Sequence, residues 1–292
     1  MESCATSQYW GRQFKAHGHD IKLIPPQFTV PYRRAQKNDF NDAAAIAEAA
    51  SRPGMKTVPL RSQGQTDIQC LHRARELVVE DCVRLGNQIR ALLLENGYAI
   101  PQGRATLAKV IPSCLDADQP TLSPRLRDLI QRLFGRWQEL EKERRQFDKE
   151  IAALADSQPL CQRLMTIPGI GPLIATALFA AVGNASQFKS ARNLAAWIGL
   201  VPRQYSTGGK TRLLGLSKHG NAYLRKLLVH GARAVVRTAP GRNDPLRQFA
   251  DRLARRSHVN IVCATANKIA RIAWALLQQD QVYRTTGVSP IA

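Results

Sequence analysis

Long apolar runs are missing from this sequence. The longest one, Leu173 to Gly183, is shorter than the ~20 apolar residues that a membrane-spanning helix needs, so no transmembrane segment is expected. Glu2 and Ser3 follow Met1 where a signal peptide would have a basic segment and then an apolar one. We therefore expect a cytoplasmic protein with no membrane partner.

Paired cysteines are missing as well. The six cysteines contain no C-x-x-C pair, and the six histidines show no spacing typical of metal ligands. Scattered cysteines of this kind indicate buried thiols in a reducing compartment, and they argue against a disulfide framework or a zinc site.

Acidic residues are scarce in the carboxy-terminal half. The 292 residues include 42 Lys and Arg against 22 Asp and Glu, a formal net charge of +20. From Gln158 onward there are 19 basic and three acidic residues, against 23 and 19 before it. A charge excess confined to one half indicates a surface that binds nucleic-acid phosphates, because a requirement for solubility alone would spread the charge evenly.

The order of the sequence signals predicts a mostly α-helical α+β chain. Residues 1–62 alternate short helices (5–16 and 38–50) with short strands (21–24 and 58–60), a small α/β fragment. Apolar residues spaced by three and four predict two long helices within residues 63–157, forming a coiled-coil helical hairpin whose connecting loop, 97–124, contains four prolines. Residues 158–280 predict an all-α domain with helices at 173–182, 191–198, 222–236 and 259–278, and a polar, basic loop at 202–220. Residues 281–292 form a tail.

Two motifs in the basic half suit phosphate binding. In Pro168-Gly169-Ile170-Gly171, before an alanine-rich helix, glycines would let the backbone amides approach a phosphate, as in a helix-hairpin-helix turn; the alternative is a tight turn between packed helices. The second motif, residues 205–226, mixes hydroxyls and glycines with cations. Cations beside a serine could stabilise a phosphoryl transition state, although a basic loop that grips phosphates without catalysis fits the composition better.

Two carboxylates in the first domain share one helix face. Asp39 and Asp42 are three residues apart at a helix start. Paired carboxylates suit Mg²⁺ or Mn²⁺, and the alternative is that they stabilise the positive end of the helix dipole.

Several segments together resemble one family. MESCATSQYW, IKLIPPQFTVPY and KNDFNDAAAIAEA resemble the catalytic domain of DEDD-type insertion-sequence transposases, a family that includes Piv-like DNA invertases and bridge-RNA-guided recombinases. The run from PGIGP through FKSARNLAAWIGLVPR to SKHGNAYLRKLL resembles the carboxy-terminal transposase domain of the same family.

The resemblance implies a function and a set of residues. It implies an RNase H-like domain that binds Mg²⁺ or Mn²⁺ through acidic residues, here Glu2, Asp39 and Asp42. It also implies a catalytic serine, Ser206 or else Ser217, that attacks a DNA phosphodiester and forms a phosphoserine link. The implied partners are DNA, a structured guide RNA and further copies of the chain joined through the coiled coil. The residues assigned to DNA binding are Gly169, Gly171, Lys210, Arg212, Lys218 and Arg225.

One feature departs from the family pattern. The family has a first Asp upstream of the Glu, whereas Glu2 here follows directly on Met1. We therefore expect a partial RNase H-like domain, truncated at the amino terminus, and impaired transposase activity. The alternatives are a decayed DNA- or junction-binding protein and a nuclease that cuts with metal-activated water.

Overall fold

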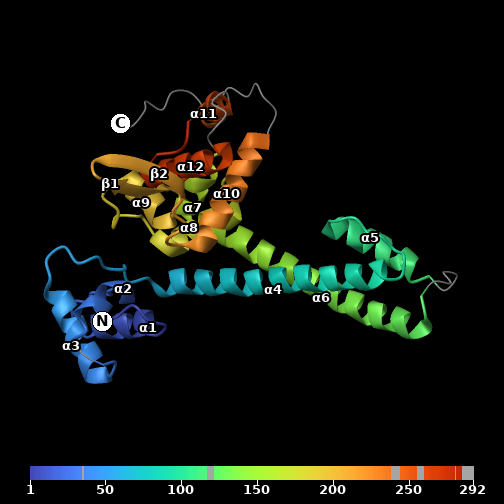
Figure 1. Ribbon diagram of the computed structural model, residues 1–292, viewed down its shortest axis with the longest axis horizontal. Helices are drawn as coiled ribbons and strands as arrows, with labels where there is room; N and C mark the ends of the chain where they lie inside the picture. Colours follow the sequence, from blue (N-terminus) through green and yellow to red (C-terminus); the bar gives the residue numbers. More distant parts are fainter. Residues whose placement is uncertain (35, 117–121, 238–243, 255–259, 280, 285–292) are drawn as a thin grey trace.

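The computed structural model describes residues 1–34, 36–116, 122–237, 244–254, 260–279 and 281–284. It shows an amino-terminal segment beside one end of a long helical hairpin, and a carboxy-terminal group of helices packed on the same hairpin (Figure 1). Within these residues, no helix combines the length and apolar character that crossing a membrane would need.

The amino-terminal segment is mainly helical. It contains α1 (Ser7–Ala16), α2 (Pro26–Thr29), the 3-10 helix η1 (Val30–Tyr32) and α3 (Asp39–Ser51). The predicted strands are reduced to two isolated bridges, a parallel one between Glu2 and Ile24 and an antiparallel one between Leu23 and Val58. Leu23 and Ile24 are nevertheless fully buried, so this short contact forms the local core in place of a sheet.

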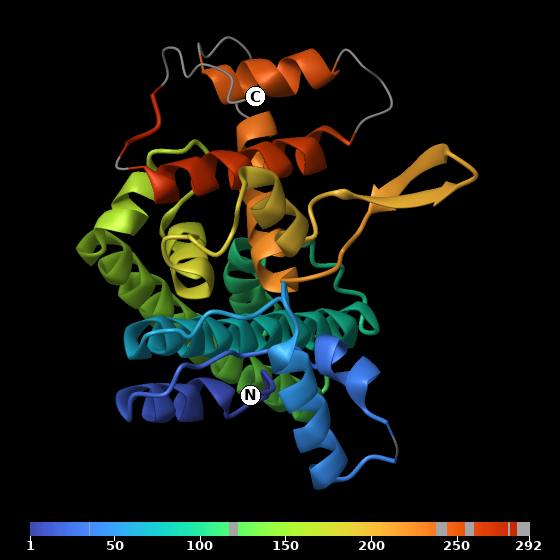
Figure 2. The same cartoon turned by 90° about the vertical axis from the view of Figure 1, so that its left-hand side faces the viewer.

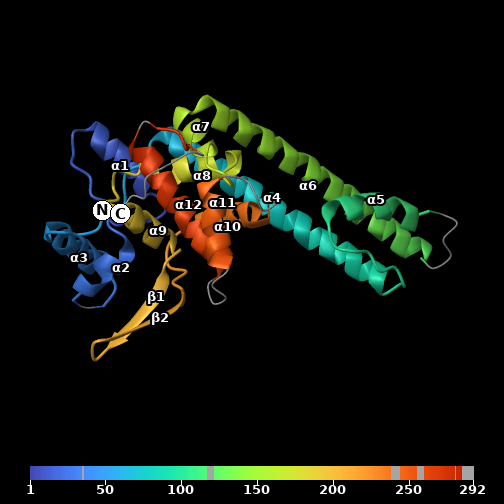
Figure 3. The same ribbon diagram turned by 90° about the horizontal axis from the view of Figure 1, so that it is seen from above.

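Helices α4 (Gln63–Leu94) and α6 (Pro124–Ser157) form the long hairpin and lie against each other. Ser62 starts α4 with a reciprocal capping box that includes Gln65, which satisfies two backbone donors at the helix start. Figure 3 shows the far end of the hairpin extending away from the carboxy-terminal helices.

The prediction of a loop between the two long helices was wrong over part of its length. Arg104–Cys114 forms α5, with Pro112 only two residues before the helix end. Leu107, Ile111 and Cys114 follow helical spacing and are buried against the hairpin tip, so their burial outweighs the proline. The tip core consists of Ile89, Leu93, Leu107, Ile111, Cys114, Leu122, Ile130, Phe134 and Trp137.

The carboxy-terminal unit surrounds one apolar helix. Its helices are α7 (Pro159–Met165), α8 (Pro172–Val182), α9 (Ala191–Ile198), α10 (Ala222–Arg237), α11 (Pro245–Ala254) and α12 (Ile261–Gln278). Buried residues run round α8, and the other helices contribute to the same core. α7 and α11 were not predicted, and each begins with a proline at its first position, where a missing N–H is tolerated.

The prediction of an all-α carboxy-terminal domain was also wrong in one place. The expected loop 202–220 contains an antiparallel hairpin of β1 (Pro202–Thr207) and β2 (Lys210–Leu216). The cysteines differ from expectation too: Cys82, Cys114 and Cys161 are buried, but Cys4 and Cys70 are exposed.

Candidate nucleic-acid interface

The β1–β2 hairpin projects from the helical body (Figure 2). Gly208 and Gly209 form its two-residue turn with φ values of 54° and 75°. Two successive positive φ angles are required in the type I′ turn, whose twist matches that of paired strands, and glycine adopts them without strain. Residues 202–215 are all exposed, so the hairpin presents both of its faces to a partner.

Strand alternation separates the hairpin side chains into two faces. Tyr205 pairs with Arg212, and Thr207 pairs with Lys210. Because pairs one residue apart along a strand point to opposite sides, these four side chains share what we call the cationic face. The opposite face, which we call the hydroxyl face, carries the Ser206–Thr211 and Gln204–Leu213 pairs. Arg203 lies at the irregularity between Pro202 and Gln204.

The two candidate serines differ in accessibility. Ser206 is exposed, and its Oγ accepts a hydrogen bond of 2.7 Å from Nε2 of Gln204. Ser217 lies where β2 ends, its backbone N–H donates to the carbonyl of Val201 at 2.8 Å, and its Oγ is buried without a hydrogen-bond partner within the described chain. A nucleophile needs access to the phosphorus, so the geometry favours Ser206.

The same alternation separates Ser206 from the predicted cations. Lys210 and Arg212 belong to the cationic face, whereas Ser206 belongs to the hydroxyl face. The sequence suggested that these cations lie beside the serine, but within the hairpin they lie on the opposite face from it. A phosphate bound by both groups would lie at an edge of the hairpin.

The base of the hairpin is fixed by close backbone contacts. A Cβ at Gly220 would lie 1.9 Å from the carbonyl oxygen of Trp197, and one at Gly199 would lie 2.1 Å from that of His219. Arg225, a predicted DNA contact, points into this junction and donates from Nη1 to the carbonyl of Ile198 at 2.9 Å. It thereby satisfies a carbonyl at the end of α9, which is a structural role.

Lys218 lies exposed in the segment between β2 and α10, with a φ of 55°. This left-handed backbone conformation is uncommon for residues other than glycine, asparagine and aspartate. It fits a tight turn that leaves the Lys218 side chain exposed just after β2, and its phosphate contact stays a prediction.

The two glycines of the P-G-I-G turn have different environments. Gly169 has a φ of 85°, and a Cβ there would lie 2.6 Å from the carbonyl oxygen of Gly231 on α10. This is the tight packing contact that was the alternative interpretation of the motif. Gly171 precedes α8, is exposed and has open space around it, so only this glycine leaves room for a phosphate.

The predicted metal ligands are not brought together. Among the described residues, no group of three or more His, Cys, Asp or Glu side chains could hold a metal ion. Asp42 instead pairs with Nη1 of Arg33 at 3.3 Å, a partner that the sequence analysis missed. Asp39 is exposed at the start of α3, and Asn38 caps that helix by accepting from the N–H of Asn41 at 2.8 Å. Glu2, Asp39 and Asp42 as arranged here do not fit a divalent cation.

Comparison with known proteins supplies an independent line of evidence. Residues 161–247 match a family model described as "Transposase IS116/IS110/IS902 family", and residues 2–96 match a DEDD transposase model of the IS110 group. A "Probable family 20 transposase" of Pseudomonas aeruginosa is 42% identical, over 97% of this chain and 85% of its own length. The transposase for insertion sequence element IS1111A of Coxiella burnetii is 40% identical, over 97% and 78%. The pilin gene-inverting protein of Moraxella bovis is 23% identical, over 96% and 80%.

Proposed function

Because this chain belongs to the IS116/IS110/IS902 family of transposases, we propose that it binds, cleaves and rejoins DNA strands with Ser206 as the nucleophile. The single observation that carries this proposal is the exposed β1–β2 hairpin, at whose edge a phosphate can reach both the hydroxyl of Ser206 and the cations of the other face.

The cationic face is the proposed DNA-binding surface. The major groove of duplex DNA admits a two-stranded β-ribbon, and Lys210 and Arg212 would neutralise phosphates along its edges. Tyr205 shares that face and is 64% exposed, so its ring can pack on a sugar or a base. Lys218 and the open turn at Gly171 extend the phosphate contacts.

The chemical step follows from the accessible serine. Oγ of Ser206 attacks the phosphorus of a phosphodiester and displaces one sugar oxygen, so that a phosphoserine ester forms as the P–O bond to the sugar breaks. The serine proton passes to solvent, and the leaving oxygen takes up a proton. Attack by a hydroxyl group of the second strand reverses the exchange and regenerates the serine, with no change of oxidation state.

The DEDD transposase match suggests that relatives use a divalent metal. Since the three carboxylates are not gathered here, we assign no step of the reaction to a metal held by this chain.

Assembly with further copies, and with a structured RNA, completes the proposal. Helix α4 exposes Leu77, Val83 and Leu94, which are 58%, 50% and 62% exposed. These side chains are the apolar contacts that a second copy of the hairpin would cover. The net charge of +20 favours any polynucleotide, which includes a guide RNA.

A binding protein without catalysis is the second candidate function, because separation of the serine from the cations would also suit a surface that only grips DNA. The test is a denaturant-resistant DNA adduct formed with a nicked, labelled duplex. Ser206→Ala should abolish the adduct while DNA binding persists. Thr211→Ala removes the paired hydroxyl on the same face, and this variant should still form the adduct. If no variant and no wild-type protein forms an adduct, the catalytic proposal is wrong and the binding function remains.

A further inference from the structure

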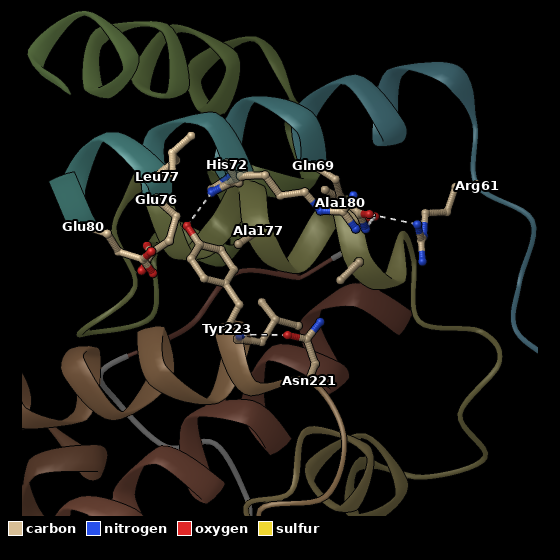
Figure 4. A pocket seen from close by; sticks show the side chains of 13 residues that line it. Arg61, Gln69, His72, Glu76, Leu77, Glu80, Ala177, Ala180, Asn221 and Tyr223 are labelled. Atoms are coloured by element: carbon tan, nitrogen blue, oxygen red, sulfur yellow. Dashed lines mark hydrogen bonds between the residues drawn. The ribbon is translucent and has the colours of Figure 1, made fainter. Parts of the chain in front are cut away.

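A cavity of about 450 Å³ lies between α4, α8 and the beginning of α10 (Figure 4). Its volume falls in the range of about 300–1,000 Å³ that is typical of small-molecule sites. Its lining contains none of the residues predicted from the sequence as site residues. The cavity is therefore a feature separate from the hairpin.

A directional hydrogen-bond chain fixes one wall of the cavity. His72 is 3% exposed; its Nδ1 lies 2.9 Å from the hydroxyl of Tyr223, and its Nε2 lies 2.9 Å from Oγ1 of Thr176. Thr176 donates its own hydrogen to the carbonyl of Pro172 at 2.8 Å. Nε2–H of His72 must then donate to Thr176, and the hydroxyl of Tyr223 donates to Nδ1. These hydrogen bonds hold the ring of Tyr223 in place.

The two titratable side chains in this hydrogen-bond network, His72 and Tyr223, are neutral at physiological pH. Burial, together with the charge of Arg75, lowers the pKa of His72 to about 4. Burial raises the pKa of Tyr223 to about 12. The wall is accordingly uncharged, and its hydrogen bonds are made within the protein.

Two arginines lie in the lining without a counterion. Arg61 and Arg73 form no ion pair with any carboxylate in the described parts of the chain, and Arg73 is exposed. Nη1 of Arg61 donates to Gln69 at 2.8 Å, while its buried Nε–H has no partner within those same parts. Burial and then the charge of Arg73 lower the pKa of Arg61. An anion placed between the two guanidinium groups would offset both effects.

The opposite end of the cavity has the opposite character. Figure 4 shows Glu76 and Glu80 far from Arg61, with Tyr223 between them. Glu76 pairs with Lys226, whose Nζ also lies over the Tyr223 ring at 5.3 Å. Arg61 marks an anion-binding end, Tyr223 an aromatic middle, and Glu80, which has no ion pair among the described residues, a far end that can accept hydrogen bonds from amines, an order that matches the layout of a nucleotide.

We propose that this cavity binds one nucleotide unit, with its phosphate at Arg61 and Arg73 and its base beside Tyr223. The proposal rests on the proposed function, since a nucleic-acid strand is one source of such a unit. A free nucleoside monophosphate is the other source, and both share the chemistry that the cavity recognises.

The test is calorimetric titration of the full chain with dCMP. Arg73→Gln changes an exposed side chain with no hydrogen bond within the described residues, so folding should be unaffected. Loss of charged hydrogen bonds to the phosphate should weaken dCMP binding about tenfold to a hundredfold. The matched control is Arg192→Gln, an exposed arginine on α9 outside the cavity lining, and it should leave affinity unchanged. The absence of saturable binding, or equal loss in both variants, would overturn the proposal.

Two further arms distinguish the sources and the proposals. Tighter binding of a single-stranded trinucleotide than of dCMP assigns the unit to a strand, whereas equal or weaker binding assigns it to a free nucleotide. Duplex binding is measured in parallel with Lys210→Gln/Arg212→Gln. A chain that binds duplex through the hairpin but does not bind dCMP refutes the cavity alone. A chain that binds dCMP but keeps full duplex affinity in the double variant refutes the hairpin alone.

Discussion

The carboxy-terminal unit and the amino-terminal segment hold their candidate site residues in different ways. Helix α8 is buried on nearly every side, and the β1–β2 hairpin emerges from a junction where Gly199 and Gly220 allow backbone groups to touch. Residues 1–62 bury few large side chains, chiefly Leu23 and Ile24. A dense core can fix where a projecting loop points, whereas the segment without one leaves its carboxylates apart.

The largest expected effect is a packing change in the carboxy-terminal unit. A Cβ at Gly231 would lie 2.2 Å from the carbonyl oxygen of Gly169. Gly231→Ala should therefore lower the free energy of unfolding by about 3 kcal/mol or more, because two backbones must separate. Gly135→Ala on α6, with open space around it, should instead raise it by about 0.5–1 kcal/mol. Chemical denaturation of both variants measures the contrast, and equal effects would show that the contact is loose.

The next effect is a pH dependence at His72, where α4 of the hairpin packs on α8 and α10 of the carboxy-terminal unit. The pKa of His72 is about 4 in the folded chain, below its ordinary value of 6.5. As pH falls below 6.5, the imidazole of His72 takes up a proton in the unfolded chain before it does so in the folded chain. The free energy of unfolding therefore keeps its full value above pH 6.5 and falls by about 3 kcal/mol between pH 6.5 and 4. Denaturation across this range checks it. His72→Gln should flatten the profile and the exposed His219→Gln should not; a profile that His72→Gln leaves unchanged would contradict the assignment.

The smallest stability effects are expected in the amino-terminal segment. The side chains of Arg33 and Asp42 are 27% and 31% exposed, and a pair at this depth contributes about 0–1 kcal/mol. Asp42→Asn should thus change the free energy of unfolding only slightly. Millimolar Mg²⁺ should leave the Tm of wild type and variant unchanged, since a ligand that does not bind the native state cannot stabilise it. A rise in Tm with Mg²⁺ that Asp42→Asn removes would show a metal site.

The same comparison separates what the sequence could predict from what it could not. Helices α4 and α6 followed from apolar residues spaced by three and four, because each helix buries one stripe of side chains. The hairpin was missed although Gly208-Gly209 between β-forming residues is a turn signal. Helix α5 was missed because prolines suggested a loop.

The candidate site residues also include features that the sequence could predict and features that it could not. The exposed position of Ser206 agrees with its proposed role, but its separation from Lys210 and Arg212 depends on strand register, which composition does not reveal. The His72–Tyr223 contact joins residues 151 positions apart, and a single sequence carries no local signal for it. Gly169 packs on α10, which agrees with the alternative that the sequence left open, a tight turn between packed helices.

The central claim is that the cationic face of the hairpin, and not the amino-terminal segment, holds DNA. Its most direct measurement is the salt dependence of duplex binding between about 50 and 200 mM salt. Lys210→Gln/Arg212→Gln should reduce the slope of log affinity against log salt by about 2, since each lost phosphate contact removes about 0.9. Lys15→Gln/Lys22→Gln, two exposed cations of the amino-terminal segment, should leave it unchanged. An unchanged slope in the hairpin variant, or an equal reduction in both, would contradict the account.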